Sequence, residues 1–91
     1  MSINQYESVT VSTTGIGITS TLTDNQENYA LVTCETASVR FRLDGTAPTS
    51  SVGHVLDPGD ALVLEGDEVR NFLAIRKDGA DATLRVSVGN K

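Results

Sequence analysis

The chain has 91 residues, of which seven are basic and 12 acidic, and a formal net charge of −5. This length leaves room for one domain core, and the acidic balance argues against nucleic-acid binding, which needs a basic face. No apolar run exceeds four residues, as at 61–64, which is too short to span a membrane, and the first residues lack the pattern of a secretory signal. A single cysteine and a single histidine exclude an internal disulfide framework and a Cys/His metal cage, so no cofactor is expected.

The composition predicts an all-β chain. Val, Ile and Thr are abundant, eight glycines punctuate the sequence, and helix-forming residues never accumulate. Residues 1–8 are polar apart from Ile3 and Tyr6, so we interpret them as a flexible N-terminal arm, either disordered or ordered on a neighbouring subunit. Residues 9–91 are then a single compact β-sandwich domain.

The domain is expected to begin with one or two short strands within residues 8–22, bent or bulged at Gly15 and Gly17. A phosphate-binding loop at these glycines is disfavoured, because no strand–GxGxxG–helix unit surrounds them. The polar block that follows, residues 23–28, suits a turn or a single helical turn.

Two strands with different patterns come next. Residues 29–33 have apolar side chains on both faces, which predicts a central strand buried on two sides, and Cys34 beside it is a core residue rather than a nucleophile. Residues 39–43 alternate strictly, with apolar side chains toward the core and Arg40 and Arg42 on the opposite face. These arginines either recognise a carboxylate or phosphate or, as we favour, form a solvated face paired with acids of neighbouring strands.

Residues 44–53 have no periodicity and form the longest predicted loop. It begins with a strong Asp-Gly turn signal, and loops of this length often carry binding. The candidate contact residues lie in the arm, on the arginine face and around this loop: Ile3, Tyr6, Arg40, Arg42, Asp44, Thr46, Pro48, Thr49 and His54.

The rest of the chain is predicted to form hairpins. Residues 53–65 have the pattern of two strands joined by a turn at 57–60, residues 69–76 follow as another strand, and a turn at 77–81 leads into the last strand, 84–88. A total of about seven or eight short strands is typical of an antiparallel β-sandwich or small jelly roll. A core of this size stabilises a chain only modestly, which favours self-association.

Site chemistry is sparse. The acids between Asp57 and Glu68 could supply some ligands of a calcium site, but no calcium-binding motif is present, and acids at turns commonly serve solubility. Catalysis is not expected, because the acids lie at solvated turns and His54 has no nucleophile motif beside it. A sugar-binding platform usually needs exposed aromatic rings. This chain has no Trp, two Tyr and two Phe, which are too few to favour such a platform.

The segment from Ala30 to Leu56 resembles a small protein encoded among bacteriophage structural genes. Its most characteristic part is Arg42-Leu-Asp-Gly-Thr-Ala-Pro-Thr49, which is followed by Gly53-His54. The similarity continues through Asp57-Pro-Gly-Asp60, Leu64-Glu-Gly66, Phe72 to Arg76 and the strand that ends at Val88, so that it covers roughly residues 30–88.

This resemblance implies a non-enzymatic virion protein similar to the capsid decoration or cement proteins that sit on phage heads, often as homotrimers. The implied partners are further copies of the chain and the major capsid protein. The implied location is the capsid surface of the virion, after assembly in the host cytoplasm. The alternative is a tail- or fibre-associated module that binds a host-surface glycan, because small β folds are shared by components throughout phage particles.

Overall fold

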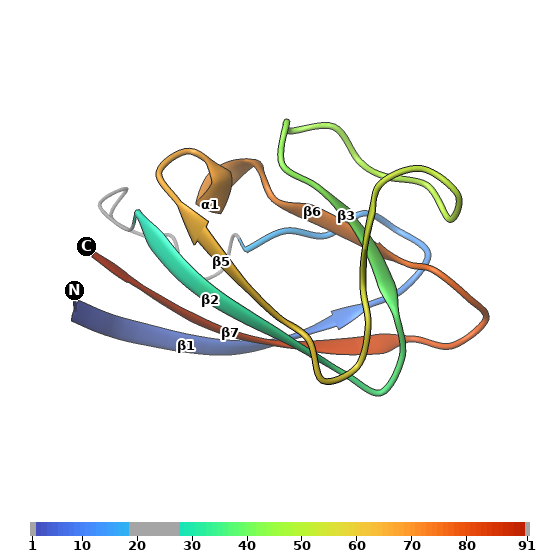
Figure 1. The fold of residues 1–91 in the computed structure, drawn as a ribbon, viewed down its shortest axis with the longest axis horizontal. Coiled ribbons are helices and arrows are strands. Elements are labelled where there is room, and N and C mark those ends of the chain that lie inside the picture. The colour runs from blue at the N-terminus through green and yellow to red at the C-terminus, as the bar shows by residue number, and fades with distance from the viewer. Residues whose placement is uncertain (1, 19–27, 91) are drawn as a thin grey trace.

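A computed structural model describes residues 2–18 and 28–90, which form two antiparallel β-sheets packed face to face (Figure 1). In this described part, one sheet has four strands in the order β1-β7-β2-β5, and the other has three in the order β4-β3-β6. The predicted all-β sandwich is therefore confirmed. The element bounds are β1 Ser2–Val11, β2 Tyr29–Glu35, β3 Val39–Arg42, β4 His54–Leu56, β5 Ala61–Glu65, α1 Glu68–Asn71, β6 Leu73–Arg76 and β7 Ala82–Asn90.

The chain crosses between the two sheets at almost every connection, which is the winding of a jelly roll. Between β1 and β2, Ile16 makes an isolated antiparallel bridge to Ala74 on β6. With this bridge in place of a strand, each sheet has four members. Among the described strands, only β3 and β4 are both consecutive in the sequence and paired.

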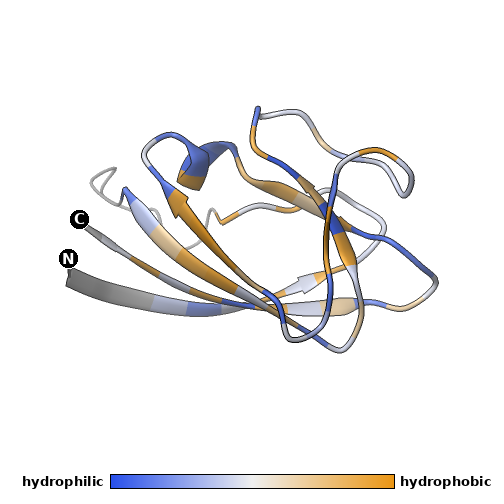
Figure 2. Cartoon of the chain, viewed as in Figure 1, coloured by the Kyte–Doolittle hydropathy of each residue, from blue (hydrophilic) through white to orange (hydrophobic). Residues whose placement is uncertain are grey.

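The core lies between the sheets, because alternate residues of each strand point inward. Apolar residues recur along the strands that face each other (Figure 2). β2 is central in its sheet, as predicted, but it is buried on one face only, since Leu31 on the other face is exposed. The buried residues include Val9, Val11, Ala30, Val32, Cys34, Leu64, Ala82, Leu84, Val86 and Val88 from the first sheet, Val39, Phe41, Leu56 and Ala74 from the second, and Ile18, Val69 and Phe72 from the connections.

The predicted separation of an N-terminal arm from the domain is wrong, because residues 2–11 form the single strand β1. It pairs with β7 from Ser2 opposite Asn90 to Val11 opposite Ala82, with a bulge near its start. Apolar alternation begins only at Val9, but a ladder is held by backbone hydrogen bonds and so continues through polar residues. Residues 19–27, which include the end of the expected 8–22 strands and most of the polar block, lie outside the described residues.

Two predicted hairpins are also wrong. The turn at 57–60 joins β4 to β5 and the turn at 77–81 joins β6 to β7, but in each case the two strands belong to different sheets. Turn residues make the chain reverse, whereas the burial of strand faces decides which sheet the chain enters. Within the predicted strand 69–76, the structure has the end of α1 followed by the shorter strand β6.

Candidate docking surface

The loop between β3 and β4, residues 43–53, is fastened to the second sheet by Arg40. The Arg40 guanidinium donates hydrogen bonds to two loop carbonyl oxygens, that of Ser50 at 3.2 Å and that of Gly53 at 2.9 Å. Such bonds from a charged donor are stronger than those between neutral groups. The predicted pairing with acids of neighbouring strands is therefore wrong for Arg40, which holds the loop instead.

The start of the loop is a compact turn built on Asp44. Its carboxylate accepts a hydrogen bond from the Thr46 backbone N–H at 3.2 Å and forms an ion pair with Arg42. The hydrogen bond from Arg42 is the main reason that the pKa of Asp44 lies below its ordinary value, and the bond from Thr46 adds to it. A carboxyl group with a lowered pKa stays ionised at neutral pH, so the contribution of this turn is lost only as the pH falls through the folded-state pKa.

The end of the loop requires glycine at position 53. Gly53 has a φ of +132°, and a Cβ there would lie 3.0 Å from both the Phe41 carbonyl oxygen and the Pro48 Cβ. Thr49 and Val52 bond to each other through their backbones, at 3.0 and 3.3 Å, and close the tip of the loop. Pro48 is buried, whereas Thr49 is exposed at the tip.

A hollow of about 540 Å³ lies beside the loop. His54 contributes to its wall, and the His54 ring centroid is 5.4 Å from that of Phe41 in the core. The structure thus brings three predicted contact residues, Arg42, Asp44 and His54, to one place. The full lining is Arg42, Leu43, Asp44, Val52, Gly53 and His54.

A second hollow, of about 340 Å³, lies on another side of the same loop. Pro48, Thr49 and Ser50 contribute to it together with residues at the end of β6. The loop therefore stands between two depressions. Of the two, the first hollow has apolar side chains within a polar rim, which is an arrangement that protein interfaces commonly use. The first hollow therefore suits an apolar side chain of a partner protein.

The acidic turns stabilise the backbone. The Asp57 carboxylate accepts a hydrogen bond from the Ser38 hydroxyl at 2.6 Å, that of Asp60 from the Asp57 N–H at 3.0 Å, and that of Glu68 from the Glu65 N–H at 3.0 Å. Within the described residues, no group of three or more His, Cys, Asp and Glu side chains is placed to hold a metal ion. The Asp60 and Glu68 carboxylates thus brace their own turns, whereas that of Asp57 joins its turn to Ser38.

Cys34 lies in the core and is only 1% exposed. Its thiol donates a hydrogen bond to the Ala37 carbonyl oxygen at 3.1 Å. Burial is the main reason that the pKa of Cys34 is raised, and the nearby carboxylates of Asp57 and Asp60 add to the effect. A thiol kept neutral in this way fits the predicted core role, because the thiolate is the nucleophilic form.

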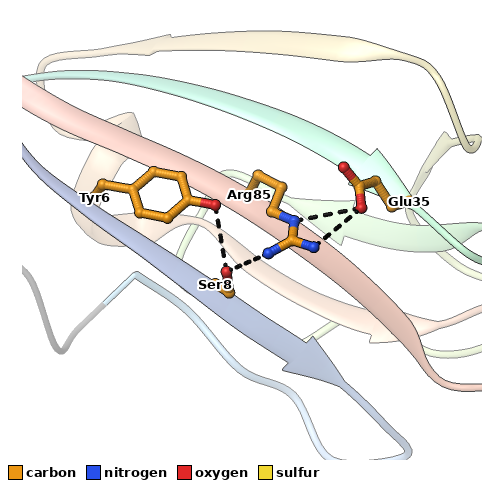
Figure 3. Close-up of polar contacts among 4 residues, drawn as sticks. All are labelled: Tyr6, Ser8, Glu35 and Arg85. Carbon is orange, nitrogen blue, oxygen red and sulfur yellow. Dashed lines mark hydrogen bonds and ion pairs between the residues drawn. The ribbon is translucent and has the colours of Figure 1, made fainter.

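The two predicted contact residues of the arm, Ile3 and Tyr6, lie on β1 and away from the loop in the sequence and in the sheet order. Tyr6 is 61% exposed, and its hydroxyl lies 3.4 Å from that of Ser8, which accepts a hydrogen bond from Arg85 at 2.7 Å (Figure 3). The bond with Ser8, followed by the effect of Arg85, lowers the pKa of Tyr6. The candidate residues therefore fall in two separate parts of the fold, one on each sheet.

The sequence analysis did not single out several exposed apolar residues, among them Val52 in the loop, Leu31 on β2 and Val63 on β5. It assigned Leu31 to a strand buried on both faces, which placed the side chain in a core. No sequence signal marks Val63, because residues 61–64 are all apolar and only the structure shows which of them is exposed.

Among the residues that the structure describes, no helix is long and apolar enough to cross a membrane. Comparisons of the chain with models of protein families, with curated proteins and with solved structures found no match.

Proposed function

We propose that this protein is a non-enzymatic structural subunit of a phage virion, a capsid decoration protein that binds the head surface and stabilises the shell. The resemblance of the 42–54 segment to phage structural proteins supports this proposal. The observation that carries it is the fastening of the loop, whose backbone is held by Arg40 and the Asp44 turn while Thr49 at the tip is exposed. A loop that is already ordered loses little conformational entropy when it docks.

The proposed contact combines a hollow with a charged rim. An apolar side chain of the shell protein would enter the hollow beside Val52 and His54, and the partly exposed Arg42–Asp44 pair would meet polar groups around it. Contacts of exposed charges are screened by salt, so binding should weaken as ionic strength rises. Many copies on one shell stabilise it through mass action even where each contact is weak.

The test is cosedimentation of the purified protein with capsids of the parent phage. Val52 is 52% exposed at the hollow, so Val52→Lys should preserve the fold and place a charge where the apolar side chain would enter. Ala80→Lys is the control, because it adds the same charge at an exposed residue of the turn between β6 and β7 that lines neither hollow. We expect wild type and A80K to pellet with capsids and V52K to bind about tenfold more weakly, a loss of about 1.4 kcal/mol.

Two outcomes would contradict the proposal. If V52K pellets as well as wild type, the loop and its hollow are not the contact. If wild type ignores capsids, labels the tail tip in immunogold images and binds glycans on an array, the tail-associated alternative replaces capsid decoration.

A further inference from the structure

The outer face of the four-stranded sheet carries a row of uncharged side chains that crosses all four strands. The register sets Val63 of β5 opposite Leu31 of β2, Leu31 opposite Ser87 of β7, and Ser87 opposite Tyr6 of β1. The three large members are open to solvent, with Tyr6 61%, Val63 46% and Leu31 38% exposed. Large apolar side chains aligned across neighbouring strands are what one sheet presents to another in a sandwich.

Beside this row on the same face, the charge of Arg85 is balanced within the chain, while on the other side of the row Glu65 of β5 lies opposite Tyr29. Arg85 on β7 donates hydrogen bonds to the Ser8 hydroxyl at 2.7 Å and to the Glu35 carboxylate at 3.3 Å. Figure 3 shows these side chains beside Tyr6, contributed by β1, β2 and β7. The uncharged row is thus bordered by an ion pair that is satisfied within the chain.

We propose that the outer-face row, made of Tyr6, Ser87, Leu31 and Val63, is the surface on which a second copy of the chain packs, sheet against sheet. Charge indicates this occupant. Two chains of net charge −5 repel each other over most orientations, and a face whose arginine is already neutralised is where repulsion is weak. An uncharged row is also complementary to itself, which a contact between identical surfaces requires.

The size of the face agrees with such a contact. Strands of ten, nine, seven and five residues, with a rise of about 3.4 Å per residue and a spacing of about 4.8 Å, give a projected area of roughly 500 Å². The accessible area of a corrugated face exceeds its projection, so the value is of the order of the ~800 Å² that each partner buries in a standard interface. By contrast, the exposed Val55 lies on the other sheet, directly opposite Arg40 of the neighbouring strand.

The test is the mass of the protein in solution by light scattering, over a range of concentrations and without capsids. We expect wild type to reach twice the chain mass of 9.6 kDa, and Val55→Lys (V55K) on the other sheet to do the same. Val63→Lys should weaken association at least tenfold, because it places a charge at the β5 end of the packed row. The two variants exchange the same side chains at similar exposure, 46% and 40%, so only the face differs.

Tyr6→Ser is a second variant at the other end of the row. It replaces V63K as the test of association if circular dichroism shows that V63K does not fold. It should also shift the protein toward monomer. A wild type that stays monomeric at all concentrations, or an oligomer that V63K and Y6S both leave intact, would overturn the inference. Because capsids are absent from this measurement, its result is independent of whether the protein decorates a shell.

Discussion

At the scale of single residues, the position of the loop depends most on Arg40. Its side chain joins the middle of β3 to two carbonyl oxygens near the far end of the loop, those of Ser50 and Gly53. A carbonyl group that loses such a donor must find water or remain unsatisfied. The arginine that was expected to face acids is therefore a positioning residue for the surface that we propose to bind capsids.

Arg40→Met retains a long side chain and removes both hydrogen bonds. We expect the free energy of unfolding, measured by urea denaturation, to fall by about 1–2 kcal/mol, and capsid binding to weaken as the loop loosens. Arg85→Met is the control, because Arg85 bonds to exposed side chains and surface pairs contribute little. Equal losses of stability in the two variants would show that Arg40 has no special role.

The Cys34 thiol supplies a prediction about pH and reactivity. Its pKa is raised in the folded chain, so its contribution to stability is complete below the unfolded-state pKa and is lost as the pH rises through the folded-state value. At pH 8, a thiol-modifying reagent should react at least about a hundredfold more slowly with the native protein than with the urea-unfolded chain, because reaction requires the sandwich to open. Similar rates in the two states would mean that Cys34 is accessible.

At the scale of elements, residues 12–18 show how a segment without regular structure can serve as the edge of a sheet. The Ser12 carbonyl oxygen accepts a hydrogen bond from the Arg76 N–H at 3.0 Å, and Ile16 and Ala74 exchange two further bonds. At Gly17 a Cβ would lie 2.6 Å from the Phe72 carbonyl oxygen. Only glycine lets the chain approach the neighbouring backbone this closely.

Gly17→Ala should therefore lower the free energy of unfolding by about 1–3 kcal/mol, because the backbone must shift to accept the methyl group. The matched control is Gly79→Ala, where a Cβ would meet nothing within 4 Å. Thermal unfolding of the two variants provides the comparison. If G17A unfolds at the same temperature as G79A, the close approach at Gly17 does not constrain the fold.

The sequence predicted those elements whose two faces differ in polarity. Alternation identified β3 and β7, because each has one buried face and polar residues on the other. Alternation did not identify the start of β1, because the polar residues there are held by the backbone ladder. It also did not identify α1, because the buried residues there, Val69 and the C-cap Phe72, are three positions apart. Strand partners were not predictable either, because turns such as Asp57-Pro-Gly-Asp60 are compatible with both a hairpin and a crossing between sheets.

The candidate site was predicted in part. The loop was identified by its lack of periodicity, and Arg42, Asp44 and His54 do meet at one hollow. The role of Arg40 was not predictable, because bonds from a side chain to backbone carbonyl groups ten and 13 residues away leave no pattern in the sequence.

At the scale of the whole molecule, the two proposed surfaces lie on different sheets. The loop and its hollow belong to the second sheet, while the outer-face row belongs to the first, and one core joins them in a body of 35 × 23 × 18 Å. A subunit can therefore contact a shell through one sheet and another copy through the other. Substitutions at Val52 and Val63 should then have independent effects, because the free-energy changes of substitutions at distant sites without shared partners are additive.

The most direct test of capsid decoration is amide hydrogen exchange of the protein, free and bound to capsids of the parent phage. We predict that exchange slows in residues 43–54 on binding. Exchange should stay unchanged in the turn at residues 65–68, which follows β5. Protein that pellets with capsids while residues 43–54 exchange at the same rate as in the free chain would contradict the account.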